Sequence, residues 1–383
     1  MMFDVLLSIV IAFTVTFLAI PVIINVAEMK KLYDVPDGDR KVHHAPITPL
    51  GGIAIFAGFT FGCLLTIHFE QSYEFQYFIA AALIIFFLGL KDDILIISAI
   101  KKFIGQVLAA FMIIYYGGIQ IKSMHGFLGI YQLPETFSLL LSYFAVIVII
   151  NSFNLIDGVD GLAGGLGLMA STIFGFYFLN ENMLSYSILA FAMAGSLLAF
   201  LIFNFQPAKI FMGDTGSLLI GSICAILAIK FINVAGSSDV STPIAAAPAI
   251  AFTILIIPLL DTLRVFAIRI FYRRSPFSPD RNHIHHILLD RGFSHRNITL
   301  LLVSINLVLI ALVYYGRFLG CTILILSAIA FFFMFTALLY TIKVKPSLTI
   351  AQATSNMPDD NIERKPASKI VSFVNENILE QKN

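Results

Sequence analysis

Long apolar stretches separated by short polar loops dominate this chain. A transmembrane helix needs about 20 predominantly apolar residues, whereas a transmembrane strand shows alternating segments of about ten. Most of the apolar stretches reach the helical length, so the pattern predicts an all-α integral membrane protein. We predict a bundle of eleven transmembrane helices, at residues 4–27, 50–69, 77–90, 104–119, 136–152, 162–180, 185–204, 217–235, 244–265, 298–315 and 318–340.

The composition supports this class. Apolar residues make up 58% of the 383 residues and charged residues 12%, whereas a soluble protein has about 25% charged residues. The net charge of +1 indicates no nucleic-acid partner. The three cysteines lie in separate apolar segments and form no CxxC pair, which predicts small core residues and no disulfide framework.

The distribution of Lys and Arg predicts the orientation, because these residues accumulate on the cytoplasmic side. With the N-terminus outside, the cytoplasmic segments hold 21 of the 24 Lys and Arg residues. We therefore expect a multi-pass protein with an external N-terminus and a cytoplasmic C-terminus. Residues 1–340 would form the transmembrane catalytic domain. Residues 341–383 would form a cytoplasmic tail with a polar linker and a short amphipathic helix.

Acidic residues gather at the predicted cytoplasmic ends of the apolar segments. Ionisable residues in or beside a membrane span are costly, and they are functional candidates by default. Carboxylates held at one level repel one another and need a cation, and oxygen ligands suit Mg²⁺ or Mn²⁺. The six residues concerned are Asp92, Asp93, Asp157, Asp160, Asp214 and Asp261.

Two motifs carry most of this pattern. In NSFNLIDGVDG (151–161) the polar residues Asn151, Asn154, Asp157 and Asp160 recur every three positions. On a helix this spacing predicts one slowly drifting polar stripe. In FMGDTGS (211–217), Asp214 or the serine that follows it could cap a helix, and the glycine-rich turn could also cradle a phosphate.

The longest cytoplasmic loop is basic and contains the motif HIHH (283–286). Its histidines, His283, His285 and His286, follow Arg281, and Lys41 lies in the first cytoplasmic loop. Basic groups facing a carboxylate–metal cluster favour a polyphosphate clamp. A zinc site is the alternative, although no cysteine or second histidine pair accompanies the motif. A nucleotide diphosphate and a lipid acceptor could meet at such a site, since phosphoryl transfer needs mainly positioning and charge neutralisation.

In these motifs, and in Lys91-Asp92-Asp93, residues 1–340 resemble the polyprenyl-phosphate N-acetylhexosamine-1-phosphate transferases. The chain is most similar to the bacterial branch that uses undecaprenyl phosphate and starts cell-envelope glycans such as lipopolysaccharide or teichoic acid linkages. The resemblance implies transfer of a sugar 1-phosphate from a UDP-sugar to the lipid phosphate, with release of UMP. HIHH is the form associated with N-acetylglucosamine, and another UDP-N-acetylhexosamine is the alternative. The resemblance also implies location in the bacterial inner membrane, and a homodimer is compatible with it.

The resemblance also implies roles for individual residues. Asn154 and Asp214 would bind the metal, Asp92 and Asp93 would act near the lipid phosphate as base or nucleophile, and Asp157 and Asp160 would border the nucleotide. Phe211 would stack on uracil, and Asn151 would contact the substrate. A basic residue often follows the Asp-Asp pair by three positions in this family, and here Ile96 stands in that place.

Three other classes fit less well. A CDP-alcohol phosphotransferase would need an Ala-Arg after its Asp-Gly, and membrane prenyltransferases space their Asn and Asp residues by four rather than three. An ion-coupled transporter would favour charges near the midplane and an internal repeat. The acidic residues here lie at one face, and the two halves show no repeat.

Overall fold

The structure is a computed structural model of the chain, and it describes residues 2–32, 47–70, 72–95, 97–237, 240–241, 243–273 and 282–341. Its first half contains α1 (Met2–Lys30), α2 (Gly51–Thr66), α3 (Glu74–Ile94), α4 (Ala99–Phe111), the π-helical turn η1 (Met112–Tyr116), β1 (Ser123–Phe127), β2 (Ile130–Gln132), α5 (Glu135–Ile156) and α6 (Leu162–Asn180). The second half contains α7 (Leu184–Asn204), α8 (Gly213–Ala235), α9 (Ala247–Ile254), α10 (Ile256–Phe271), α11 (Ile284–Asp290), α12 (His295–Tyr315), the 3₁₀ turn η2 (Arg317–Leu319) and α13 (Cys321–Thr341).

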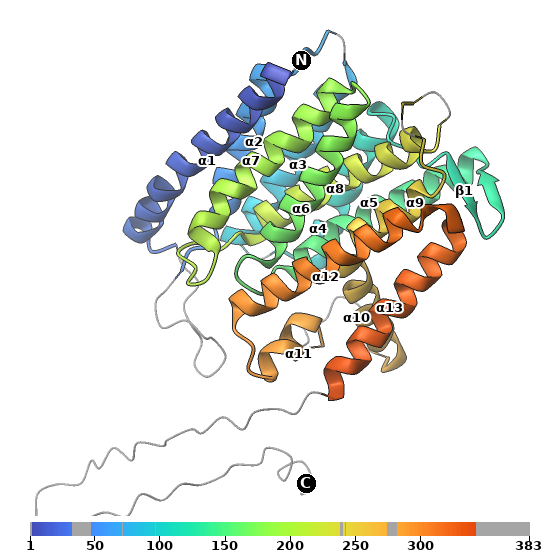
Figure 1. Cartoon of the computed structure of the whole chain (residues 1–383). Coiled ribbons are helices and arrows are strands. Elements are labelled where there is room, and N and C mark those ends of the chain that lie inside the picture. Colours follow the sequence, from blue (N-terminus) through green and yellow to red (C-terminus); the bar gives the residue numbers. More distant parts are fainter. Residues whose placement is uncertain are drawn as a thin grey trace, which may run out of the picture. The chain divides into compact units, whose positions relative to one another are not determined.

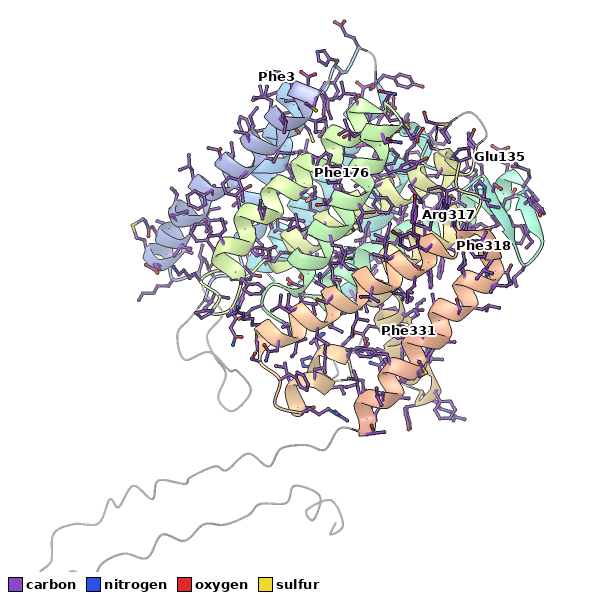
Figure 2. The ribbon with its side chains drawn as sticks, in the orientation of Figure 1. Phe3, Glu135, Phe176, Arg317, Phe318 and Phe331 are labelled. Atoms are coloured by element: carbon purple, nitrogen blue, oxygen red, sulfur yellow. The ribbon has the colours of Figure 1, made fainter. Side chains whose placement is uncertain are left out.

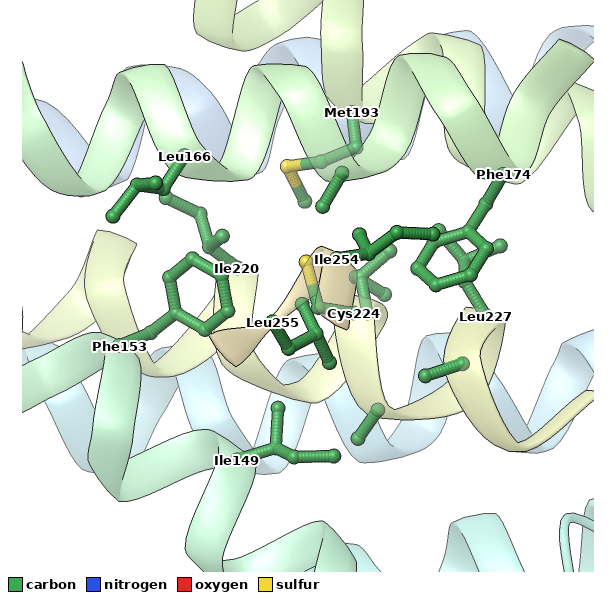
Figure 3. Packing of buried hydrophobic residues seen from close by; sticks show 14 of the residues in the cluster. Ile149, Phe153, Leu166, Phe174, Met193, Ile220, Cys224, Leu227, Ile254 and Leu255 are labelled. Atoms are coloured by element: carbon green, nitrogen blue, oxygen red, sulfur yellow. The ribbon is translucent and has the colours of Figure 1, made fainter. Parts of the chain in front are cut away.

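Helix α8 lies at the centre of the bundle. It packs against α2, α3, α5, α6, α7 and α9, and α1 covers α2 and α7 from outside (Figure 1). Ile220, Cys224 and Leu227 of α8 point into a core that also receives Phe153 of α5 and Phe174 of α6 (Figure 3). All three cysteines are buried and free, as the sequence predicts. The central position of α8 matters because its first turn carries Asp214.

The outside of the bundle is apolar as well as its core. Phe3, Phe176 and Phe318 are 72%, 60% and 81% exposed, and they project from the surfaces of different parts of the chain (Figure 2). Many other large apolar side chains are exposed as well, a pattern that is rare in water-soluble monomers and typical of proteins that contact lipid. Within the described residues, eight helices are long and apolar enough to cross a membrane, or up to nine with the bent pair α9–α10. The predicted class of helical, multi-pass membrane protein is confirmed.

Each of the eleven predicted apolar segments contains a helix. The third segment is longer in the structure than predicted, because α3 continues to Ile94 and so includes Asp92 and Asp93. The prediction of an all-α chain was incomplete, since β1 and β2 form an antiparallel hairpin with Ser123 opposite Gln132. Gly126 near the end of β1 and Gly129 in the turn both adopt positive φ, a conformation that glycine adopts without strain.

The ninth predicted segment is broken rather than continuous. Helices α9 and α10 meet at an angle of 76°. Pro258 lacks the N–H that would bond to the carbonyl of Ile254 four residues earlier, so the helix bends there. Asn306 of α12 donates its side-chain N–H to that carbonyl at 3.0 Å. The bend is thus stabilised by a neighbouring helix, and it directs α10 and its Asp261 along a different path from α9.

Residues Met1–Ile342 form one compact unit. The predicted tail of residues 341–383 lies outside the described residues except for Thr341.

Candidate functional site

One ammonium group connects its own helix, α4, to three other helices at the centre of the predicted site. Nζ of Lys102, in the first turn of α4, lies 3.1 Å from Oδ2 of Asp92 at the end of α3. It also donates to Oδ1 of Asn154 on α5 at 3.2 Å, and to Oδ2 of Asp214 on α8. Two carboxylates and one amide oxygen therefore converge on a single cationic atom, and the predicted metal ligands Asn154 and Asp214 are neighbours.

Asn154 is held in place by its amide nitrogen. Nδ2 donates to Oδ1 of Asp214 at 2.6 Å and to Oγ of Ser217 at 3.0 Å, which leaves Oδ1 directed at Lys102. Asn151, one turn earlier on α5, exchanges two amide hydrogen bonds with the buried Gln106 of α4, at 2.9 and 3.2 Å. Asn151 thus links α4 to α5, and its predicted contact with substrate stays a prediction.

The predicted helical stripe ends early. Helix α5 stops at Ile156, so Asp157 is its C-cap residue and Asp160 lies in the turn before α6. Gly161 has φ +78° and donates its N–H to Oδ1 of Asn204, so the chain reverses direction here. The expectation that all four polar residues share one helical face was wrong, because the glycines of DGVDG allow this turn.

Asp157 and Asp160 remain close to the other carboxylates despite this turn. Removal from water, followed by the nearby charges of Asp214, Asp93 and Asp160, raises the pKa of Asp157 to about 8. Like charges favour the protonated form. Asp160 is buried and lies 3.2 Å from Nδ1 of His295, at the start of α12. The acidic groups therefore influence one another electrostatically across α5, α3 and α8.

The start of α8 is built from two distant segments. The backbone of Phe211 and Met212 pairs with residues 48–52, with the N–H of Gly51 donating to the carbonyl of Phe211 at 2.9 Å. Gly213 has φ +69°, and a Cβ there would lie 2.1 Å from the carbonyl oxygen of Pro49. Phe211 itself is half-buried beside this turn. Neither Asp214 nor Ser217 caps α8, contrary to one option from the sequence; the carboxylate of Asp93 accepts hydrogen bonds from the first turn instead.

Asp261 belongs to a separate group. It is fully buried on α10, and its Oδ2 lies 2.8 Å from Nδ1 of His283. Its Oδ1 accepts from the N–H of Ile284 at 3.0 Å and from Arg264 at 2.9 Å. The prediction that six carboxylates share one cation therefore fails for Asp261, whose charge is already compensated by Arg264 and by hydrogen bonds from the His motif.

The three histidines of HIHH occupy different environments. His283 is buried at the N-cap of α11 and paired with Asp261. His285 is 1% exposed, and its ring stacks on His283 with centroids 5.5 Å apart. Its Nε2 lies 2.3 Å from where a Cβ of residue 158 would be, so Gly158 admits this ring. Burial lowers the pKa of His285 to about 3, which keeps the ring neutral. His286 is half-buried.

These contacts bring the HIHH segment against the turn that follows α5, although 127 positions separate residues 158 and 285. The predicted clamp residues Lys41 and Arg281 lie outside the described residues.

The oxygen set suits a hard divalent cation. Asp92, Asp214 and Asn154 direct oxygens from three helices at one positively charged atom, and carboxylate and carbonyl oxygens are the ligands that Mg²⁺ prefers. Among the residues that the structure describes, no three His, Cys, Asp or Glu side chains converge as a metal site. The described residues therefore provide no set of ligands for the alternative zinc site at HIHH.

Comparison with known proteins agrees with this geometry. The profile of glycosyl transferase family 4 matches residues 75–232, a range that includes Asp92, Lys102, Asn154 and Asp214. A decaprenyl-phosphate N-acetylglucosaminephosphotransferase from Mycobacterium leprae is 35% identical over 287 residues, which cover 69% of this chain and 72% of the relative. The undecaprenyl-phosphate alpha-N-acetylglucosaminyl 1-phosphate transferase of Escherichia coli K12 is 32% identical over 320 residues, which cover 80% and 84%. The chain belongs to glycosyl transferase family 4.

Three positions of this family 4 protein were missed or misjudged from the sequence. Lys102 follows the Asp-Asp pair at an unexpected distance, and only the packing of α4 against α3 and α5 shows which side chains it contacts. Thr215 was passed over as part of a turn, yet its hydroxyl contacts Asp93. Asp261 was grouped with the metal-site acids, although Arg264, three residues later, was a signal for local charge pairing.

Proposed function

We propose that the protein transfers N-acetylglucosamine 1-phosphate from UDP-N-acetylglucosamine to undecaprenyl phosphate, and so initiates a cell-envelope glycan. As a member of this family the protein is a transferase, and its relatives are named for transfer of N-acetylglucosamine phosphate to decaprenyl or undecaprenyl phosphate. The observation that carries the proposal is the convergence of Asp92, Asn154 and Asp214 on Lys102. This arrangement combines negative ligands for a metal with a positive group for phosphate.

The reaction is a phosphoryl transfer without redox chemistry. An oxygen of the lipid phosphate attacks the phosphorus that carries the sugar, and the bond from that phosphorus to the bridging oxygen breaks. UMP leaves with the electron pair, and the product is undecaprenyl-diphospho-N-acetylglucosamine. Asp92 would accept the proton of the lipid phosphate, and Lys102, 3.1 Å from it, would hold the attacking phosphate by charge.

Asp214 and Asn154 would hold a Mg²⁺ or Mn²⁺ ion. Such an ion would neutralise charge on the diphosphate of the UDP-sugar. It would also favour ionised carboxylates, and so oppose the mutual repulsion that raises the pKa of Asp157.

The nucleotide-sugar would occupy the side of the site that faces HIHH. Asp261 accepts the Nδ1 proton of His283, so Nε2 of His283 is the nitrogen available to substrate. His283 and His286 would contact the diphosphate and sugar, whereas buried His285 supports the turn at Gly158. Phe211 would stack on uracil, and Asp157 and Asp160 would border the nucleotide.

For the membrane topology we propose eleven spans with an external N-terminus and location in the bacterial inner membrane. Support comes from the eight long apolar helices together with the bent pair α9–α10, and from α2 and α3, which fill the two remaining predicted segments. Asp92, Asn154 and Asp214 lie at one end of the bundle. By the distribution of Lys and Arg, this end would face the cytoplasm. A nucleotide-sugar made in the cytoplasm would reach the site directly.

A panel of UDP-sugars tests the assignment. Purified protein with undecaprenyl phosphate and Mg²⁺ is expected to release UMP with UDP-N-acetylglucosamine far faster than with UDP-glucose. Preference for another UDP-N-acetylhexosamine would keep the reaction and change the sugar. Release of UMP from none of them, together with ion flux in proteoliposomes, would instead favour the transporter alternative.

A further inference from the structure

The N-terminus of α8 is capped by a residue of another helix. Its own N-cap residue, Met212, makes no side-chain hydrogen bond. Oδ1 of Asp93 on α3 accepts from the N–H of Asp214 at 2.6 Å, and Oδ2 accepts from the N–H of Thr215 at 3.0 Å. The first N–H groups of a helix have no partner within that helix, and a carboxylate also interacts favourably with the helix dipole. Asp93 therefore supplies the missing cap.

Thr215 adds a third hydrogen bond to the same carboxylate. Its hydroxyl is fully buried and donates to Oδ2 of Asp93 at 2.5 Å. Two glycines permit this approach: a Cβ at Gly213 would lie 2.7 Å from an oxygen of Asp93, and a Cβ at Gly89 would lie 2.5 Å from Cα of Thr215. The close contact of α3 with α8 is thus built around this carboxylate.

The two residues of the Asp-Asp pair have different partners. Asp92 accepts from the N–H of Ile97 at 2.9 Å and faces Lys102, which it shares with Asp214. Asp93 directs both oxygens at the backbone of Asp214 and at Thr215. Both oxygens of Asp93 are therefore engaged by donors that belong to the framework of α8.

We propose that Asp93 and Thr215 form one positioning pair, which fixes the first turn of α8 and hence the carboxylate of Asp214. In this assignment Asp93 is neither the base nor the nucleophile, and Thr215 belongs to the functional machinery as a positioning residue. The inference rests on the proposed function, because it assigns Asp214 to the metal that this function uses.

The test compares substitutions of Thr215 that keep or remove the hydroxyl. In Thr215→Val, loss of a hydrogen bond to a charged group is expected to raise the Mg²⁺ concentration for half-maximal turnover about tenfold. The KM for the lipid phosphate should remain unchanged. Thr215→Ser keeps the hydroxyl and should stay within about twofold of the parent protein. Thr253→Val is the matched control, since the Thr253 hydroxyl is buried and bonds only to its own helix, at Ala249.

A double substitution separates positioning from proton transfer. If the two residues act as a unit, Asp93→Asn combined with Thr215→Val should lose no more than Asp93→Asn alone. Losses that multiply, or a Thr215→Val protein with the parent's Mg²⁺ dependence, would overturn the proposal. The Mg²⁺-dependent rise in unfolding temperature gives a readout without turnover, and it should be smaller in Thr215→Val than in Thr215→Ser. If that difference appears while no variant or parent releases UMP, the positioning pair stands and the proposed reaction fails.

Discussion

His283, at the N-cap of α11, and Asp261 of α10 form a buried pair. Nδ1 of His283 lies 2.8 Å from Oδ2 of Asp261, and the other oxygen of Asp261 binds Arg264 and the backbone of Ile284. A carboxylate on one ring nitrogen fixes the tautomer and the orientation of an imidazole. The bend after α9 therefore has a chemical consequence, because it places Asp261 where it can orient the first histidine of HIHH.

Replacing Asp261 with Asn should disturb this orientation while preserving shape. An amide can present its N–H₂ group to Nδ1 and so favour the other tautomer of His283. We expect kcat/KM for UDP-N-acetylglucosamine to fall about ten- to a hundredfold, the range found when a partner that orients a functional histidine is removed. The substitution also removes the ion-pair partner of Arg264, which affects stability. The fraction of folded protein is therefore measured, and activity is expressed per folded molecule. Exposed His68, replaced with Gln, provides a control for histidine loss. An unchanged kcat/KM in Asp261→Asn would contradict the role given to this pair.

Lys102 should matter far more than its neighbour Lys101. Removing the ammonium in Lys102→Ala leaves Asp92 and Asp214 without their shared positive partner, and turnover should fall tenfold or more by the ~1.5–3 kcal/mol scale of charged hydrogen bonds. Lys101 is exposed on the same turn of α4, so Lys101→Ala should retain the parent rate. Steady-state kinetics on both variants checks this. Equal losses in the two would indicate a general effect of surface charge.

The pKa of Asp157 predicts how stability depends on pH when EDTA removes metal. The folded protein holds this proton up to about pH 8, whereas the ordinary pKa of the group is 3.8. The folded state therefore binds the proton more tightly than the unfolded state does, and stability should decline as pH rises from about 4 to about 8. Asp157→Asn should flatten this decline in thermal unfolding experiments. The same decline in the parent and in the Asn variant would mean that another group is responsible.

The topology can be tested with reporters at two positions. A reporter fused after residue 383 should lie in the cytoplasm, and one inserted between residues 236 and 243 should lie outside, because the Lys and Arg residues are so unevenly distributed. Protease accessibility in membrane vesicles gives the measurement. A cytoplasmic signal from residues 236–243 would place Asp214 on the external side, away from a cytoplasmic nucleotide-sugar.

The helical class followed from local sequence patterns, whereas the grouping of Asn154 with Asp214 was expected from the family resemblance. Apolar length predicts spans, and Asp92, Asn154 and Asp214 lie at the ends of such spans. The break at Pro258 was missed, since the apolar pattern continues through it and the compensating donor, Asn306, lies on another helix. The end of α5 before Asp157 was missed because three-residue spacing looks helical until a glycine of positive φ reverses the chain.

The partners of the charged residues depend on helix packing, which no local pattern encodes. Lys102 finds Asp92 and Asp214 only because α4 lies against α3 and α5. Asp93 and Asp92 are adjacent in sequence and chemically identical, yet one faces the backbone of α8 and the other faces Lys102. Chain spacing alone could identify the acidic residues without distinguishing which of them is free to meet a substrate.

The central claim is that Asp214 lies in a metal-dependent site for transfer of sugar phosphate to a lipid phosphate. The decisive measurement is UMP release by purified protein from UDP-N-acetylglucosamine, with and without undecaprenyl phosphate, in the parent, Asp214→Asn and the distant control Asp4→Asn. The parent and Asp4→Asn should release UMP only with both the lipid and Mg²⁺ or Mn²⁺ present, and EDTA should stop it. Asp214→Asn should be slower by about a hundredfold or more, the scale for losing one electrostatic partner of a transition state. Near-parent turnover in Asp214→Asn, or full activity in EDTA, would contradict the account.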